Sequence, residues 1–235
     1  MNKQNGMMRR ITKLGLLLMM GVSMSACSKD WKEEVLLHDG KKIIVERVQN
    51  LGSRPTWESR ERAILDETIT FSLPGTSQKI VWSMSFRDDV PDQNGVNVVL
   101  LGIVNNVPYI AGYPAGCIAY NKWKRPNPPQ ILFKYEGSQW KRVTLAEFPP
   151  QLTQANVIVG GPPAEGIKSF YTAEQVNAEN HDIDDGPYKR IVREAVRYYE
   201  ESCPELVRIE GGWASPGGAK APIPIKPRNP SDVKK

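Results

Sequence analysis

The sequence is poor in the residues that most often carry out catalysis. Its 235 residues include only two histidines, His38 and His181. A Ser-His-Asp triad would need one of them, and no G-x-S-x-G turn is present to support such a triad. The sequence therefore identifies no catalytic residue, and it indicates no cofactor.

A hydrophobic run of membrane-spanning length is also missing. The most apolar stretch, residues 14–27, is too short to span a bilayer stably. It follows the basic residues Arg9, Arg10 and Lys13. A basic lead before a short apolar core is typical of a signal peptide.

The apolar run ends in Met24-Ser25-Ala26-Cys27, small residues directly before a cysteine. This ending resembles the lipobox of bacterial lipoprotein precursors, although Met24 stands where Leu is usual. The resemblance implies that residues 1–26 are removed and that Cys27 is acylated, with palmitate among its chains. Three acyl chains would give a durable membrane anchor. The alternatives are an uncleaved membrane helix and an ordinary secretory signal.

Ser28 follows the cysteine where enteric lipoproteins kept in the inner membrane carry Asp. By this analogy we expect the outer membrane, with the domain on its periplasmic side. Residues 27–30 would form the anchor and a short tether that reaches about 10–15 Å. The folded part should therefore lie close to the membrane.

Removal of the signal changes the charge of the chain. The segment before Cys27 holds four of the basic residues and no acid, so the formal charge falls from +5 to +1. A nearly neutral domain has no electrostatic basis for binding nucleic acid. We expect the membrane, through the lipid anchor, and an envelope protein or glycan as partners.

Two cysteines, Cys117 and Cys203, remain once Cys27 is acylated. An oxidising compartment favours a disulfide between them. The alternative is two separately buried thiols, because the sequence does not show whether the two side chains meet.

The rest of the chain is predicted to be mainly β. Alternating apolar residues such as Ile69, Phe71 and Leu73 are typical of half-buried strands, and the continuous run 96–104 is typical of a strand buried on both faces. Asp39-Gly40 predicts a type I′ hairpin turn. About nine strands are expected, at 31–37, 41–48, 68–73, 80–86, 96–104, 107–113, 117–123, 130–136 and 139–145. Residues 49–66 are expected to be a loop.

These strands predict an antiparallel meander that forms a sandwich or barrel over residues 31–150. Residues 151–209 should hold a linker and one or two C-terminal helices packed on the sheet. Thr172 and Gln175 form a capping-box pattern for a helix at 173–179, and a second helix is expected from Asp185 to about Cys203. Residues 210–235 are rich in proline and glycine and are expected to be a mobile tail.

One stretch is a candidate binding surface for an envelope protein or glycan. Tyr120, Trp123, Lys124 and Arg125 combine aromatic and basic side chains before a proline-rich turn. The alternative, which we favour, is that Tyr120 and Trp123 pack inward while Lys122, Lys124 and Arg125 are solvated.

Acidic residues offer two further candidates. His181-Asp182-Ile183-Asp184-Asp185 is dense in potential ligands, but it lacks the calcium-loop pattern, so a solvated turn is the better interpretation and no metal site is predicted. Asp88, Asp89 or Asp182 could serve a hydrolase that cleaves an envelope polymer with paired carboxylates.

The runs WKEEVLLHDGKKIIVER, TITFSLPGT, AYNKWKRPNPPQILFKYEG and WKRVTLAEFP resemble uncharacterised lipoproteins of Gram-negative bacteria, over residues 31–150. This resemblance brings no activity with it. We therefore expect a lipid-anchored envelope protein with a non-enzymatic binding or assembly role, and the hydrolase is the alternative.

Overall fold

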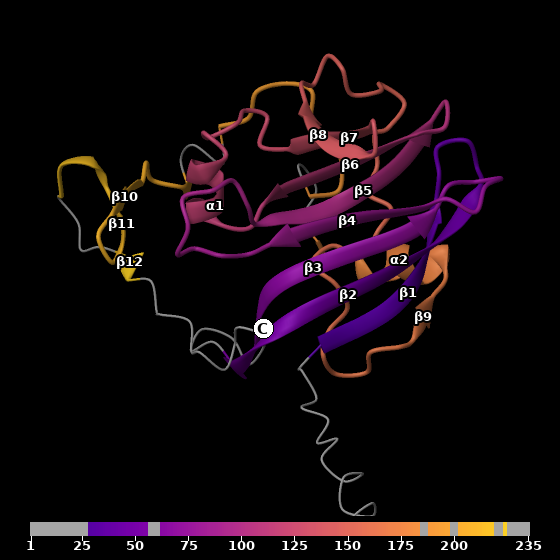
Figure 1. The fold of residues 1–235 in the computed structure, drawn as a ribbon, viewed down its shortest axis with the longest axis horizontal. Coiled ribbons are helices and arrows are strands. Elements are labelled where there is room, and N and C mark those ends of the chain that lie inside the picture. The colour runs from indigo at the N-terminus through magenta and orange to yellow at the C-terminus, as the bar shows by residue number, and fades with distance from the viewer. Residues whose placement is uncertain (1–27, 56–61, 184–187, 198–201, 219–222, 225–235) are drawn as a thin grey trace, which may run out of the picture.

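Two β-sheets packed face to face form the body of the molecule (Figure 1). The computed structural model describes residues 28–55, 62–183, 188–197, 202–218 and 223–224. The architecture is mainly β with antiparallel hairpins, as the sequence predicts, and is consistent with a sandwich. The signal peptide and Cys27 lie outside the described residues.

The first sheet has five strands in the order β4-β3-β2-β1-β9. Their bounds are Ser28–Leu36 (β1), Lys42–Pro55 (β2), Arg62–Ser72 (β3), Lys79–Ser85 (β4) and Phe170–Tyr171 (β9). The second sheet has the order β5-β6-β7-β8. Its strands are Val96–Val104 (β5), Val107–Pro114 (β6), Ile131–Glu136 (β7) and Gln139–Val143 (β8).

A small third sheet and three short helical segments complete the described elements. The third sheet has the order β10-β11-β12 and lies to one side of the sandwich (Figure 1). Its strands are Val207–Ile209 (β10), Gly212–Ala214 (β11) and Ile223–Pro224 (β12). The helical segments are Cys117–Lys122 (α1), Ala173–Glu179 (α2) and the 3-10 turn Pro216–Gly218 (η1). Within the described residues, no helix has the length and apolar character needed to cross a membrane.

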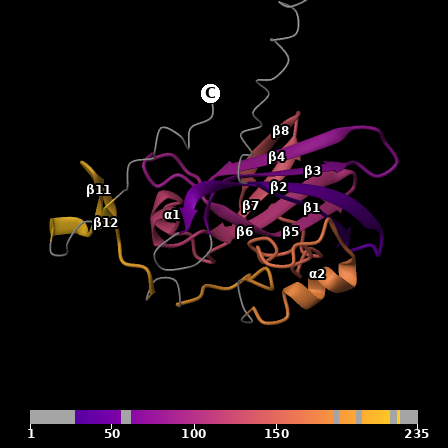
Figure 2. The ribbon, with the colours of Figure 1, turned by 90° about the horizontal axis from the view of Figure 1, so that it is seen from below.

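Period-two alternation builds the core between the two sheets. Ile69 and Phe71 of β3 point inward and are buried, while Thr68 and Thr70, which alternate with them, are partly exposed. They meet buried residues of the second sheet such as Leu101. Figure 2 shows the two sheets as successive layers.

Strand β5 is buried on both faces, as its continuous apolar sequence predicts. Val98 and Leu101 face the first sheet, whereas Val99 and Leu100 face a second core on the outer side. Residues from the later part of the chain cover that side: Phe148, Leu152 and Ile191.

The hairpin turns are found where the sequence predicts them, with one difference in type. Only Gly40 of the first turn has a positive φ, +83°, so the turn is not the expected type I′. Its amide donates to Leu37 O, which makes a three-residue connection. Asn105 and Asn106, with φ of 51° and 61°, both adopt the left-handed conformation that a type I′ turn requires.

Four sequence-based predictions are wrong. Much of the predicted loop 49–66 continues β2 and begins β3, because its polar residues pair across the sheet. Residues 117–122 form helix α1 instead of a strand. Residues 189–191 pair with 153–155 instead of forming a helix, while Asp185, its expected cap, lies outside the described residues. The described part of the predicted tail contains β11 and β12.

The capping box and the disulfide are both confirmed. The Thr172 hydroxyl accepts from Gln175 N and the Gln175 side chain accepts from Thr172 N, at the start of α2. Cys117 and Cys203 are bonded across 86 residues of sequence. Asn121 and Arg125 bind the main chain next to Cys203, so the linked segment is held at several points.

A network of buried charges occupies one end of the first sheet's inner face. Arg47 donates to Glu33 Oε1 at 3.2 Å and to Glu67 Oε1 at 2.9 Å. All three side chains are 2% exposed or less. Burial alone would lower the pKa of Arg47, but the two carboxylates outweigh it and raise that pKa. We call Glu33, Arg47 and Glu67 the ion network.

The ion network holds a segment of chain that crosses it, residues 154–161, which we call the crossing segment. Ile158 O accepts from Arg47 at 2.6 Å, and Ile158 N donates to Glu33 at 3.2 Å. Asn180, which follows α2, accepts from Val159 N and donates to Val157 O. Side chains thus satisfy main-chain groups that a strand partner would otherwise bind.

We predict that Arg47→Met lowers the free energy of unfolding by about 3–5 kcal/mol, because it leaves two carboxylates buried without their cation. Urea denaturation of the purified protein measures this loss. The matched control is Lys32→Met, which removes the exposed Lys32–Glu46 pair from the neighbouring strands and should cost less than about 1 kcal/mol. Equal losses for the two variants would contradict the prediction.

We predict that removal of the disulfide, through Cys117→Ser with Cys203→Ser, lowers the free energy of unfolding by about 4–5 kcal/mol. Without the disulfide, which joins residues 86 apart in sequence, the unfolded chain regains conformational entropy and is therefore favoured. Denaturation with and without a reducing agent checks the value. The double variant should show no further loss on reduction, and a continued response to the reductant would argue against this cause.

Candidate functional site

The predicted binding surface around Tyr120 is largely withdrawn from solvent. Tyr120 is 0% exposed and Trp123 is 4% exposed. The Trp123 indole donates to Asn94 O at 2.9 Å within the core, and the Arg125 guanidinium lies 5.0 Å from the centre of the Tyr120 ring. The inward packing that we favoured is confirmed for both rings, and they do not form a platform for a partner.

The prediction that Lys122 is solvated is wrong, because the Lys122 side chain is buried. Its ammonium group donates to Arg87 O and to Asn94 Oδ1. Burial lowers the pKa of Lys122, although Asp88 and Asp89 oppose this effect. Lys124 remains exposed.

The carboxylates named for a hydrolase do not gather in a pocket. Burial raises the pKa of the Asp88 carboxyl, Lys122 opposes this shift and Asp89 adds to it. Asp89 itself is paired with Arg87 at 2.6 Å. Asp182 is fully exposed and contacts His181 at 3.0 Å. Neither of the two pockets described below is lined by a carboxylate.

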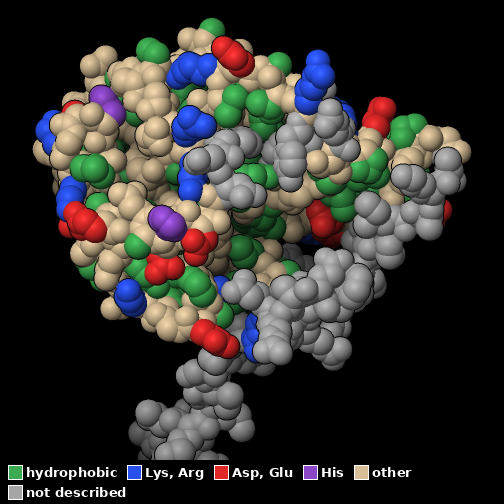
Figure 3. Space-filling model, turned by 180° about the vertical axis from the view of Figure 1, so that it is seen from behind, with side chains coloured by type: hydrophobic (Ala, Val, Ile, Leu, Met, Phe, Trp, Pro, Cys, Tyr) green, Lys and Arg blue, Asp and Glu red, His purple; other side chains and the backbone are tan. Residues whose placement is uncertain are grey.

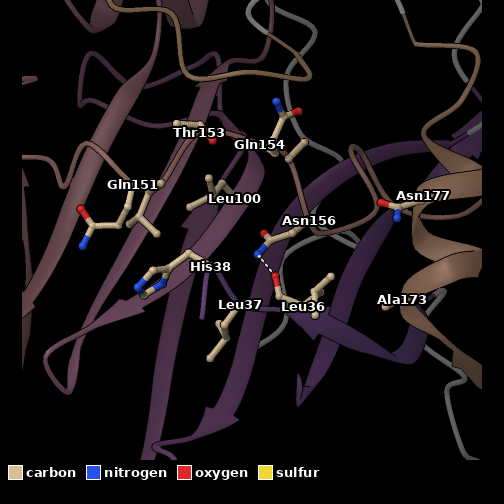
Figure 4. Close-up of a pocket in the computed structure, with 12 residues that line it drawn as sticks. Leu36, Leu37, His38, Leu100, Gln151, Thr153, Gln154, Asn156, Ala173 and Asn177 are labelled. Carbon is tan, nitrogen blue, oxygen red and sulfur yellow. Dashed lines mark hydrogen bonds between the residues drawn. The ribbon is translucent and has the colours of Figure 1, made fainter. Parts of the chain in front are cut away.

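A concave site lies where β1 ends, and we call it the amide groove. Its volume is about 480 Å³. Figure 4 shows the residues that line it. Four parts of the chain form it: the end of β1 with its turn, Leu100 of β5, the stretch before and within the crossing segment, and α2. The twelve lining residues are Leu36, Leu37, His38, Leu100, Gln151, Leu152, Thr153, Gln154, Ala155, Asn156, Ala173 and Asn177.

Asn156 forms the floor of the amide groove and ties the two sheets together. Its Oδ1 accepts from Leu101 N at 2.9 Å, and its Nδ2 donates to Leu101 O at 2.8 Å. The same Nδ2 donates to Leu36 O at 3.0 Å, the bond drawn in Figure 4. Its own amide donates to Val99 O. One side chain therefore joins the edge of β1 to the edge of β5.

The walls of the groove are polar but uncharged. Gln151 and His38 lie on one side, and Asn177 of α2 lies on the other (Figure 4). Gln151, Thr153, Gln154 and Asn177 are all exposed. Such a site offers hydrogen-bond donors and acceptors beside the leucine side chains of the lining, which suits binding of a neutral polar ligand.

A second, smaller pocket of about 160 Å³ lies beside Pro126, Asn127 and Arg142. It adjoins the predicted proline-rich turn but uses none of Tyr120, Trp123, Lys124 and Arg125. In the part of the chain that the structure describes, no group of three His, Cys, Asp or Glu side chains could hold a metal ion. On the face seen in Figure 3, basic and acidic side chains are interspersed.

Sequence reasoning missed the amide groove because its residues come from stretches predicted to be two separate strands, a turn, a linker and a helix. One signal was available. Gln151–Asn156 is rich in amide and hydroxyl side chains and contains no charged residue, in a chain that is otherwise 24% charged. Comparison of the chain with protein families, curated proteins and solved structures finds no match.

We predict that Asn156→Ala lowers the free energy of unfolding by about 2–3 kcal/mol, because three side-chain hydrogen bonds to the sheet edges are lost. It should also speed hydrogen exchange at Leu101 N, which can be followed by NMR. The control is Asn177→Ala, an exposed residue of the same groove, for which we expect a change within about 0.5 kcal/mol. Unchanged exchange at Leu101 would refute the role of Asn156.

Proposed function

We propose that this protein is a lipid-anchored component of the bacterial cell envelope with a non-enzymatic binding or assembly role. It would be attached to the outer membrane through Cys27 and face the periplasm. The amide groove would hold the partner. The lipobox Met24-Ser25-Ala26-Cys27 supports the anchor.

One observation carries the proposal: strand β1 links the expected anchor to the groove. β1 begins at Ser28, directly after Cys27, and ends at Leu36, which lines the groove. Residues 28–30 are thus part of the strand, where they pair with β2, and do not form the separate tether that the sequence suggested. A nine-residue strand extends about 30 Å.

This geometry would place membrane attachment at one end of β1 and ligand binding at the other. An acylated Cys27 would hold the Ser28 end of the first sheet at the membrane surface. The groove would then open at the other end of β1, away from the lipid. Its uncharged lining offers contacts for holding a ligand and is consistent with binding as the main task.

We predict that Cys27→Ser releases the protein from the membrane fraction, because the acceptor of the acyl chains is lost. Fractionation of cells and intact-mass measurement test this. The native protein should lack residues 1–26 and carry acyl chains, and its mass should rise by two protons on reduction of Cys117–Cys203. Cys117→Ser is the matched control and should stay with the membrane. An unprocessed native chain would overturn the proposal.

A further inference from the structure

We propose that residues 163–170, which we call the exposed loop, contact the lipid surface to which Cys27 would be attached, with Ile167 and Phe170 entering its interfacial layer. This inference rests on the proposed function, because it needs a membrane at the start of β1. It adds a second membrane contact, made by the folded chain itself, and it uses no residue of the amide groove.

The exposed loop presents large apolar side chains to solvent. Every residue from Pro163 to Phe170 is exposed. Ile167 is 37% exposed and Phe170 is 39% exposed. Aliphatic and aromatic side chains so close together on one exposed stretch are typical of segments that lie in a membrane interface. Exposed apolar residues also occur elsewhere, at Ile44 and Val81 for example, so the position of the loop has to identify its partner.

That position is beside the expected anchor. Lys29 Nζ donates to Pro162 O at 3.2 Å, and Lys32 N donates to Ser169 O at 3.0 Å. Because these two lysines follow Cys27 by two and five residues, a fully extended chain keeps them within about 7 Å and about 17 Å of it. Both ends of the exposed loop are therefore bonded to the part of β1 that an acylated Cys27 would hold at the membrane.

The parallel pairing of β9 with β1 directs the exposed loop toward the same end of the sheet. Phe170 lies opposite Lys32, and Tyr171 lies opposite Glu33. The residues before Phe170 therefore run back along β1 toward Ser28, as the chain in Figure 1 does before it enters β9. The loop lies at the β1–β9 edge of the first sheet, on the side where the lipid would be.

Buried contacts hold both ends of the exposed loop in shape. Tyr171 packs with Trp31 and Ile158 in a buried cluster, and its hydroxyl accepts from Lys168 N at 3.0 Å. Pro162, at the other end, is buried. A loop fixed in this way loses little conformational entropy on binding, so its apolar side chains can enter lipid at low cost.

The charges of the exposed loop suit an interfacial position. Glu165 and Lys168 cancel, so the segment carries no net charge that anionic headgroups would repel. The Lys168 ammonium lies 5.4 Å from the centre of the Tyr171 ring. A long lysine side chain can place its ammonium group among lipid phosphates while its methylene groups lie against apolar surface.

The effect of this contact depends on the anchor. Acyl chains on Cys27 would keep the exposed loop at the membrane surface at a high effective concentration, so a modest apolar contact is enough to be occupied. Two points of contact define an orientation that a single lipid anchor does not. The β1–β9 edge would face the lipid near Ser28, and the amide groove at the other end of β1 would stay accessible.

The test uses the full-length acylated protein in vesicles of phosphatidylethanolamine and phosphatidylglycerol. A nitroxide label is attached at Ser169→Cys in the exposed loop or, for comparison, at Ser77→Cys. Ser77 is exposed and lies in the turn between β3 and β4, at the end of the first sheet away from Ser28. The introduced cysteine is the only free thiol, since the native cysteines are acylated or bonded to each other.

We expect the label in the exposed loop to collide more often with oxygen, which dissolves in the bilayer, and less often with a water-soluble nickel chelate. The oxygen-to-nickel collision ratio should be severalfold higher for Ser169→Cys than for Ser77→Cys. Adding Ile167→Ser and Phe170→Ser should lower it to the Ser77→Cys value, because the side chains that enter the lipid are lost. The protein should still sediment with the vesicles through its acyl chains.

Two further variants separate lipid contact from other causes. Ile167→Ser alone leaves β9 unchanged and should give part of the decrease, so that a folding defect of the double variant is not mistaken for lost contact. The matched control is Ile44→Ser with Val81→Ser, which removes exposed apolar side chains from the outer face of the same sheet. This control should leave the ratio at Ser169→Cys unchanged.

Equal ratios for the two labels in the otherwise native protein would mean that the exposed loop does not touch lipid. A ratio at Ser169→Cys that survives loss of Ile167 and Phe170, or that falls equally in the control, would remove the role of these side chains. Low collision rates with both reagents, together with dipolar broadening between labels, would assign the loop to a second copy of the chain. Each of these results overturns the proposal.

A failure of the anchor would be seen separately. If Cys27 carried no acyl chains, protein without an introduced cysteine would take up a label at Cys27, and its intact mass would show no added lipid. That result would reject the anchor on which this inference rests. Acylated protein whose loop label matches the Ser77→Cys label would keep the anchor and reject the loop contact.

Discussion

The buried cation Arg47 is the constraint on which much of the remaining structure depends. A guanidinium with no exposed surface needs carboxylates around it, and Glu33 and Glu67 supply them from the two neighbouring strands. Glu33 and Arg47 then bind the amide and carbonyl of Ile158, which fixes the path of the crossing segment. Buried ion pairs contribute little net stability compared with an apolar core, so their main effect here is on geometry.

Glycine and amide side chains allow the crossing segment to lie on this polar surface. Gly161 has φ of +85°, and a Cβ there would come within 2.9 Å of the Gln49 amide and 3.0 Å of Trp31. Gln49 donates to Gly160 O, and Asn180 binds the main chain on either side of Ile158. The segment is thus held by side chains instead of a β-ladder. Because it lies across the open side of the sandwich, it leaves the amide groove between the two sheet edges.

Local pattern predicted most of the sheet but not its polar part. The hairpins from β3 to β8 follow from alternating apolar residues and from turn residues such as Asn105-Asn106, which act over a few positions. The loop predicted at 49–66 was wrong because its polar residues find partners on other strands, as Gln49 does with Glu67. The strand predicted at 117–123 was wrong because a short apolar run fits a buried helix turn equally well. The helical spacing of Tyr188 and Ile191 misled because these two residues pack against different buried clusters.

The sequence by itself determined the antiparallel β class and the capping box of α2, because each depends on residues that are close together in the chain, whereas it left open whether Cys117 and Cys203 pair. Tertiary structure alone decided that Arg47 is buried, that Tyr120 and Trp123 turn inward, and that amides from distant segments meet in one groove. The physical reason is that burial and hydrogen bonding depend on partners brought together by the fold. Gln151 and Asn177 have no relation along the chain, and the sheets and α2 make them opposite walls of one site.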